Sequence, residues 1–262
     1  MRARNYGSST FRREDLLTPN PILKVLSTLS THHVQHLLMG GQACVLYGAA
    51  EFSRDTDIVL MTGAENLRRL SSALDALDAR RIAVPPLSPE YLQKGHAIHF
   101  RCHQPDAKGM RVDVMSVMRG VAPFEELWPR RTTVELGPDT SCEVISLPDL
   151  VQAKKTQRDK DWPMIRRLVE ANYAQHAASP TSQHVAFWLR EARTVGLLLN
   201  VAEAFPELVP AVEALRPLLC FARVGQEARL AEALEQEEKR EREIDRVYWA
   251  PLRQELEELR RR

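Results

Sequence analysis

Two glycines followed by a short Asp-x-Asp segment limit the fold of this sequence more than any other feature. Gly40 and Gly41 end an apolar segment, residues 34–39, and Asp55 and Asp57 open the next one. Residues two apart in a strand project from the same face of a sheet, so the two carboxylates should lie side by side. Glycine lets backbone N–H groups approach an anion closely. The segment therefore predicts strand, glycine turn, short helix and strand, with an acidic site at their junction.

A third carboxylate lies inside another apolar strand pattern, RVDVMSV. Asp113 is flanked there by Val112 and Val114, which should point to the opposite face. A lone buried carboxylate is costly, so Asp113 should either pair with a cation, such as Arg111 or Arg101, or face a functional cleft. Two neighbouring carboxylates repel unless a cation sits between them, and their hard oxygens suit Mg²⁺. Three carboxylates on adjacent strands would hold two metal ions, as displacement at phosphorus requires.

The rest of the pattern predicts an α/β (α+β) fold, a mixed β-sheet with flanking helices. Leucines at helical spacing indicate a helix over 66–77, after a first helix that starts at residue 22. Alternating segments predict one strand pair over 97–102 and 110–117, and a second over 132–136 and 142–145. Ser146, followed by Leu-Pro-Asp, predicts the start of a helix over 146–157, and Pro163 belongs in the first turn of the next helix, with Asp159 or Asp161 as its N-cap.

Composition changes along the chain predict three parts. These are an N-terminal extension over 1–21, the α/β domain over 22–173, and an all-helical C-terminal domain over 181–262, after a linker at 174–180. From residue 225 onward, acidic and basic residues interleave at a spacing of four, which is typical of a solvated helix face. Pro251 should kink or interrupt that helix.

The charge balance excludes some classes of partner. The chain has 36 Lys and Arg against 35 Asp and Glu, a net charge of +1, which argues against a broad nucleic-acid surface. Its four cysteines stand singly, as reduced and mostly buried thiols do. The sequence contains no stretch typical of a secretory signal or a membrane anchor, so a cytoplasmic location and no membrane partner are expected.

The chain resembles the nucleotidyltransferase superfamily that includes DNA polymerase beta. The likeness rests on Gly40-Gly41-Gln42-Ala43 up to Gly48, then on SRDTDIVL and the later VDV. It is closest to small bacterial nucleotidyltransferase-like proteins, including members of toxin–antitoxin modules. The segment SLPDLVQAKKTQRDKDWPMIRRL also resembles their segment after the sheet. The resemblance covers residues 30–173 and leaves the last third of the chain unmatched.

The resemblance implies a function and a site. The protein would move a nucleoside monophosphate from an NTP to the hydroxyl of a small molecule, a tRNA end or a protein, and release pyrophosphate. It implies two Mg²⁺ ions, with Mn²⁺ as an alternative. Metal binding and catalysis would fall to Asp55, Asp57 and Asp113, of which Asp113 would also help to deprotonate the acceptor. Nucleotide binding would fall to Gly40, Gly41, Ser53, Lys154 and Arg158, and the last two share a face if they lie on one helix.

Other interpretations stay open at this stage. The chain could be a catalytically inactive member, a binding or regulatory module such as half of a toxin–antitoxin pair. Gly41, where many members carry Ser, and Glu51, where many carry Arg, favour that interpretation. His96 and His99 fall on opposite faces of their strand, which gives no compact zinc ligand set but allows a place in the cleft. Apolar residues after 185 indicate a helical core, and a homodimer or a protein partner through these helices is left open.

Overall fold

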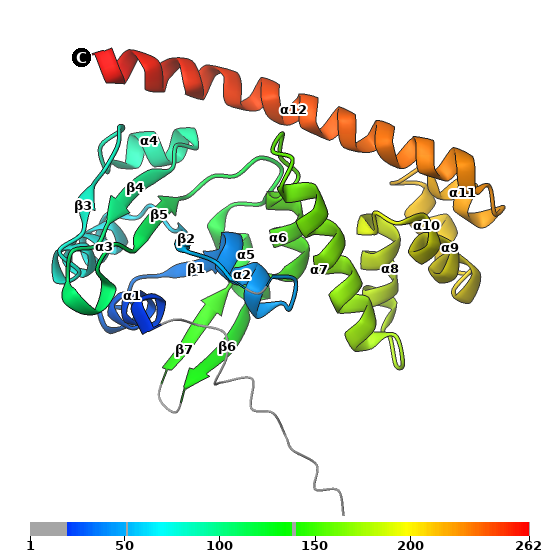
Figure 1. Cartoon of the computed structure of the whole chain (residues 1–262), viewed down its shortest axis with the longest axis horizontal. Coiled ribbons are helices and arrows are strands. Elements are labelled where there is room, and N and C mark those ends of the chain that lie inside the picture. The colour runs from blue at the N-terminus through cyan, green and yellow to red at the C-terminus, as the bar shows by residue number, and fades with distance from the viewer. Residues whose placement is uncertain (1–19, 51, 138–139, 262) are drawn as a thin grey trace, which may run out of the picture.

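The computed structural model describes residues 20–50, 52–137 and 140–261. A seven-stranded mixed sheet carries helices on both faces and is followed by a group of helices, with one long helix running along the molecule (Figure 1). The α/β (α+β) fold class is thus confirmed. The N-terminal extension up to residue 19 and Glu51 lie outside the described residues.

The sheet has the strand order β3-β4-β5-β2-β1-β7-β6. Strand β2 pairs in parallel with β5 and antiparallel with β1, which places the two acidic strand segments next to each other. Both predicted strand pairs are present, since β4 pairs antiparallel with β5 and β6 with β7. The strands are β1 His36–Met39, β2 Asp55–Leu60, β3 Arg80–Arg81, β4 Ile98–Arg101, β5 Arg111–Met115, β6 Thr132–Gly137 and β7 Thr140–Val144.

Helices occupy the predicted places, with two corrections near the site. The Ser146 hydroxyl caps its helix by accepting from the Asp149 N–H, as expected, but that helix ends at Ala153 rather than at residue 157. The next helix begins at Asp161 after Lys160, so neither predicted aspartate is its N-cap. The helices are α1 Asn20–Thr31, α2 Gly40–Leu46, α3 Ala64–Ala76, α4 Pro89–Lys94, η2 Pro105–Ala107, α5 Phe124–Leu127, η3 Trp128–Arg130, α6 Leu147–Ala153, α7 Asp161–His176, α8 Ser182–Glu191, α9 Val195–Ala204, α10 Val209–Glu213, α11 Leu219–Arg223 and α12 Glu227–Arg261.

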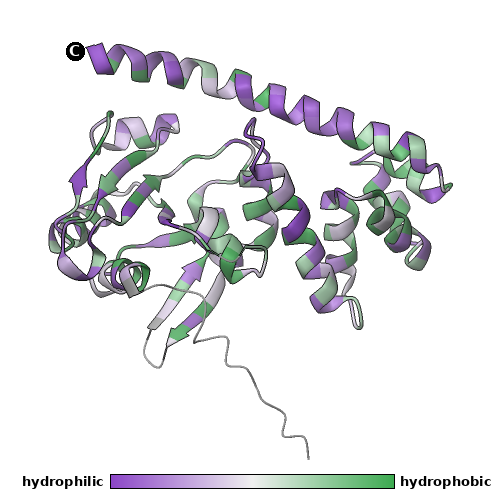
Figure 2. Cartoon of the chain, in the orientation of Figure 1, coloured by the Kyte–Doolittle hydropathy of each residue, from purple (hydrophilic) through white to green (hydrophobic). Residues whose placement is uncertain are grey.

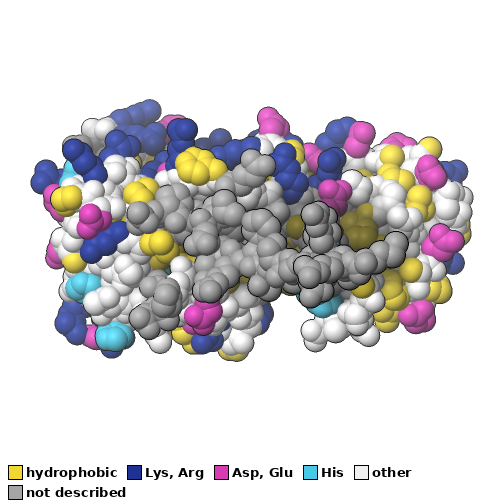
Figure 3. Space-filling view, turned by 60° about the horizontal axis from the view of Figure 1, so that its bottom comes forward, with side chains coloured by type: hydrophobic (Ala, Val, Ile, Leu, Met, Phe, Trp, Pro, Cys, Tyr) yellow, Lys and Arg dark blue, Asp and Glu magenta, His cyan; other side chains and the backbone are white. Residues whose placement is uncertain are grey.

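Two hydrophobic cores hold the sheet. One packs α1 and α3 against Ile58 and Val112, on the face opposite the acidic residues. The other includes Ile22 of α1 and the residues of β1, and it extends to Trp188 and Leu198 in the C-terminal helices. The α/β part and the helices after the predicted linker therefore share apolar packing. On the face turned forward in Figure 3, acidic and basic side chains are interspersed, and hydrophobic ones are visible over the C-terminal helices at the right.

The long helix α12 continues through Pro251, so the expected interruption does not occur, and the alternative of a kink stays a prediction. Only Leu230, Leu234, Asp245 and Leu252 are buried along it, and Figure 2 shows it hydrophilic over most of its length. Among the described helices, none has the length and apolar character needed to cross a membrane. The four cysteines are free thiols, three of them buried.

Candidate functional site

One cavity of about 570 Å³ is lined by all eight residues that the sequence singled out. They come from four places in the chain: the start of α2, strand β2 with Ser53 two residues before it, strand β5, and the segment between α6 and α7. His96 and His99 also line it, and His103 does not. The sequence had left a place in the cleft open for His96 and His99. The structure therefore brings together residues that lie up to 118 positions apart, Gly40 and Arg158.

The carboxylates share one face of the sheet. Asp57 lies directly opposite Asp113 on the neighbouring parallel strand, and Asp55 lies opposite Arg111. Burial raises the pKa of Asp57, and the charges of Asp113 and Asp55 raise it further. The charge of Lys154 and a hydrogen bond from the backbone N–H of Gly41 act in the other direction without cancelling the increase. The folded protein thus disfavours the ionised form of Asp57, and a carboxylate with such a raised pKa is typical of a functional site.

Asp113 has two protein partners. Arg111 donates from Nε to Asp113 Oδ1 over 2.7 Å, and His99 Nδ1 lies 2.9 Å from the same oxygen. Burial alone would raise the pKa of Asp113, but the hydrogen bonds from His99 and Arg111 outweigh it, so its pKa is lowered. The ion pair with Arg111 that the sequence left open is present, and no ion pair between Asp113 and Arg101 forms in the described part of the chain. A metal-binding role for Asp113 stays a prediction.

The two glycines lie in close contact with side chains of the next strand segment, Gly40 with Asp57 and Gly41 with Ser53. Gly40 has a φ of 66°, and a Cβ on it would collide with the carboxylate of Asp57. A Cβ on Gly41 would lie 2.6 Å from the hydroxyl oxygen of Ser53. A serine at position 41 would therefore require the Ser53 hydroxyl to move. The Ser53 hydroxyl instead occupies the place beside Gly41 and faces the same cavity.

Gly40→Ala should destabilise the fold by two additive effects. A left-handed backbone costs an alanine about 1–2 kcal/mol, and pushing the Asp57 carboxylate aside costs about 1–3 kcal/mol more. Gly109→Ala is the matched control, since Gly109 has a φ of 82° with no atom within 4 Å of its Cβ position. Urea unfolding should show the larger loss for Gly40→Ala, and adding Asp57→Ala should recover part of it. Equal losses at both glycines would contradict the collision with Asp57.

Lys154 and Arg158 do not share a helix face, because α6 ends before them. Both instead pair with Asp161, whose side chain is 2% exposed: Lys154 Nζ lies 3.2 Å from Oδ1 and Arg158 Nε lies 2.7 Å from Oδ2. Thr156 donates to the same carboxylate over 2.6 Å. Burial alone would raise the pKa of Asp161, but these partners outweigh it and lower the pKa. Lys154, which is mostly buried, therefore stands between two carboxylates, Asp57 and Asp161.

The donor set fits a hard cation at β2. Asp55 and Asp57 present carboxylate oxygens from one face. Burial and then the charges of Asp113 and Asp55 disfavour the ionised form of Asp57, and a cation beside it would favour that form. In the described ranges, no three His, Cys, Asp or Glu side chains form a metal-binding group by themselves. Magnesium commonly takes only one or two carboxylates and completes its shell with water and substrate phosphate, so the pair on β2 is sufficient.

One wall of the cavity comes from the helix that the sequence pattern predicts to be solvated. Asp245, Trp249, Arg253 and Leu256 of α12 line it, although that stretch has the pattern of a solvated helix. These positions are spaced by three or four residues, so they form one stripe of the helix. The only available signal was a tryptophan and a leucine in that stripe, within an otherwise charged segment.

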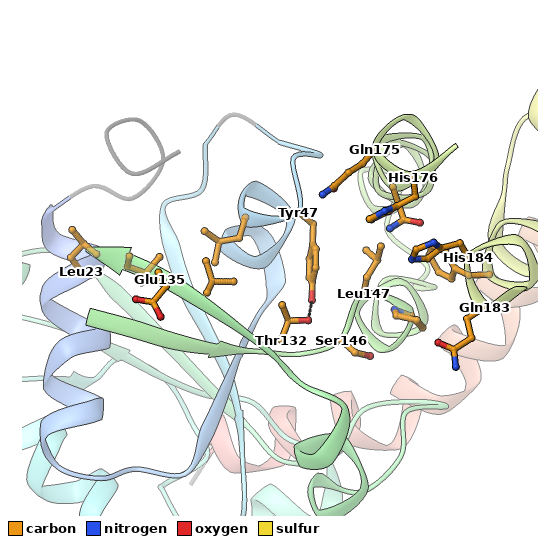
Figure 4. Close-up of a pocket in the computed structure, with 16 residues that line it drawn as sticks. Leu23, Tyr47, Thr132, Glu135, Ser146, Leu147, Gln175, His176, Gln183 and His184 are labelled. Atoms are coloured by element: carbon orange, nitrogen blue, oxygen red, sulfur yellow. Dashed lines mark hydrogen bonds between the residues drawn. The ribbon is translucent and has the colours of Figure 1, made fainter. Parts of the chain in front are cut away.

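A second cavity, of about 480 Å³, lies between the β6–β7 strand pair and helices α7 and α8 (Figure 4). The Tyr47 hydroxyl donates to the Ile145 carbonyl over 2.8 Å and lies 2.9 Å from Thr132 Oγ1. The rings of His176 and His184 stack at its side, 4.2 Å apart. None of the eight predicted residues lines this cavity, so it is separate from the acidic one.

Comparison with known proteins adds no relative. The chain matches no protein-family model, and no curated protein is significantly similar to it. The likeness to nucleotidyltransferases therefore rests on the residues quoted above, and it stays a prediction.

Proposed function

We propose that the protein is a Mg²⁺-dependent nucleotidyltransferase that moves a nucleoside monophosphate from an NTP to a hydroxyl acceptor. One observation carries the proposal: eight residues chosen from the sequence line a single cavity, with two carboxylates on one sheet face and a buried lysine beside them. A cavity of this size admits a nucleotide. Phosphoryl chemistry needs mainly positioning and charge neutralisation, which such a set supplies.

Asp55 and Asp57 would hold Mg²⁺. When bound, the ion supplies neutralisation of phosphate charge and orients the transferred group. The Asp57 carboxylate is held in place, because it accepts a hydrogen bond from the Gly41 N–H and lies close to Gly40. This supports its role as a metal ligand. Asp55 lies two residues earlier on the same face, beside Ser53.

Lys154 and Ser53 would bind the phosphates. Lys154 is only 13% exposed and is held by Asp161, so its ammonium group is positioned before any ligand arrives. The Ser53 hydroxyl beside Gly41 would replace the hydroxyl that many superfamily members carry one residue after the first glycine. Arg158, which is more exposed, would add positive charge at the rim.

Asp113 fits a positioning role better than that of a base. Its pKa is lowered, and a carboxylate with a lowered pKa removes protons from a hydroxyl poorly. Its hydrogen bonds fix Arg111 and His99 at the cavity. We therefore assign Asp113 to holding these two side chains in place.

The test measures transfer and binding together. The protein is incubated with Mg²⁺ and each α-labelled NTP in the presence of cellular RNA and protein, and pyrophosphate release is followed in parallel. We expect label transfer with one or more NTPs, and its loss on chelation of the metal. If neither transfer nor Mg²⁺-dependent NTP binding occurs, the proposal is wrong.

A catalytically inactive binding module is the second candidate, for instance one component of a toxin–antitoxin pair. The ion pair between Arg111 and Asp113 favours it, because one carboxylate of the expected catalytic set is already neutralised. NTP binding without any transfer or pyrophosphate release would support this candidate instead.

A further inference from the structure

The C-terminal helix α12 forms part of the acidic cavity. Four residues on one stripe of it line the same space as the carboxylates of β2. In Figure 1, α12 runs along one side of the molecule from α11 to the region of α4. Few of its residues are buried, so specific contacts must hold it over the cavity.

The first set of contacts fixes α12 to the wall that carries Lys154. Asp245, 2% exposed, accepts from the backbone N–H of Gln157 over 2.8 Å and from Arg119 Nε over 3.3 Å. Arg119 also donates to Glu241 over 3.0 Å and to the carbonyl of Lys155. One turn of α12 is thereby attached to the segment between α6 and α7.

The second set fixes α12 to the opposite wall, at α4 and the start of β4. Glu255 lies 2.7 Å from Lys94 Nζ and 2.7 Å from Nε2 of the buried His96. Gly95 allows the close approach, since a Cβ there would lie 2.7 Å from the hydroxyl of Tyr248. Both walls of the cavity therefore hold α12, and the helix segment between the two contacts covers the cavity.

Trp249 lies between these two contacts, about 6 Å along the helix axis from Asp245 and about 9 Å from Glu255. It lines the cavity, and its indole N–H has no hydrogen-bond partner among the described residues. The indoles of Trp162 and Trp188, in contrast, donate to Thr156 and Asn172. The Trp249 ring meets the Tyr248 ring nearly at a right angle, with the centroids 5.7 Å apart, and a ring face at a cavity wall can stack on a planar ligand.

We propose that Trp249 stacks on the base of the nucleotide, so that the C-terminal helix supplies the base-binding part of the site. This inference rests on the proposed function. The phosphates belong near Lys154 and Ser53, which leaves the uncharged, planar end of the ligand for the wall that α12 provides. Leu256 and Met118 line the same cavity and add apolar surface for a base. Every base has a ring face, so stacking alone accepts any of the four.

The experiment compares two ligands that differ in whether they carry a base. Binding of the four NTPs and of inorganic tripolyphosphate, each with Mg²⁺, is measured by calorimetry on the full chain. In Trp249→Ala, affinity for the preferred NTP should fall roughly ten-fold, while affinity for tripolyphosphate should not change. Trp249→Phe should recover most of the loss. Val247→Ala is the control, because Val247 is 64% exposed and does not line the cavity.

Each other result has a definite meaning. Equal losses for NTP and tripolyphosphate would show that Trp249 only positions the helix, and the inference would be overturned. Unchanged NTP affinity in Trp249→Ala would overturn it as well, while leaving the proposed function intact. If the unaltered protein binds neither ligand, the nucleotidyltransferase proposal itself fails.

Discussion

Asp57→Asn should abolish nucleotidyl transfer and at the same time stabilise the protein. Loss of a metal-binding carboxylate removes several kcal/mol of transition-state stabilisation, a decrease in rate on the order of a thousand-fold or more. The ionised side chain is unfavourable in the folded state, since burial and the charges of Asp113 and Asp55 raise the pKa of Asp57. Asparagine removes that charge and keeps an oxygen that accepts from the Gly41 N–H.

The raised pKa of Asp57 determines how the effect of Asp57→Asn on stability depends on pH. Because the folded protein binds a proton at Asp57 more tightly than the unfolded chain does, ionised Asp57 lowers stability at neutral pH. The gain in unfolding free energy from Asp57→Asn should therefore be largest at pH 7. It should disappear as the pH falls through the raised pKa toward the ordinary value of 3.8. Chemical denaturation at a series of pH values measures it.

The control for Asp57→Asn is Asp75→Asn, an exposed carboxylate on α3. It should change neither transfer nor stability by a measurable amount. Adding Mg²⁺ should raise the melting temperature of the unaltered protein and leave that of Asp57→Asn nearly unchanged. A variant that is less stable at pH 7, or one that keeps its activity, would contradict the assignment of Asp57.

The sequence was sufficient to predict where the carboxylates of the cavity lie, because the rules that place them are local. A period of two puts Asp55 and Asp57 on one face, and valines on both sides of Asp113 turn its carboxylate away from the core. These features depend on residues close together in the sequence, so they can be predicted without the tertiary structure. The close approach of Gly40 to Asp57 joins α2 to β2 and became visible only in the structure.

The segment between α6 and α7 was harder to predict. Helical propensity continues past Ala153, but Lys154, Thr156 and Arg158 all contact the carboxylate of Asp161. These contacts end helix α6 early. Likewise, the pairing of Asp113 with His99 depends on the register of β4 against β5, which hydrophobic alternation does not specify. Tertiary contacts override local preference at both places.

The position of α12 could not be inferred from its own residues. Interleaved charges indicate a solvated helix, and most of α12 is solvated. Its attachment to Gln157 and His96 uses partners 88 and 159 positions away. The spacing of residues within α12 does not indicate such distant partners, so the cavity wall that carries Trp249 became visible only in the structure.

Glu237→Ala should cost about 3–5 kcal/mol of folding free energy, because it leaves two buried cations without a counter-charge. Glu237 accepts from Arg193 over 2.6 Å and from Arg216 over 2.7 Å, and the two arginine side chains are 8% and 5% exposed. Arg216 also donates to the carbonyls of Leu189 and Ala192. This single carboxylate thus joins α12 to the ends of α8 and α10. Glu235→Ala is the control, since its pair with Lys239 is exposed and 3.8 Å long, and should change stability by about 0.5 kcal/mol or less.

The pH series distinguishes the lost charge pair from lost packing. Burial alone would raise the pKa of Glu237, but the hydrogen bonds and charges of Arg216 and Arg193 outweigh it and lower the pKa below 4.5. The contribution of Glu237 is therefore fully present above the unfolded pKa and is lost as the pH falls through the lowered one. The difference between Glu237→Ala and the unaltered protein should stay constant near neutral pH and narrow below about pH 4.5. A difference that does not depend on pH would mean that packing, rather than charge, anchors α12. In either case the anchor lies twelve residues before Trp249, so loosening it should also weaken NTP binding more than tripolyphosphate binding.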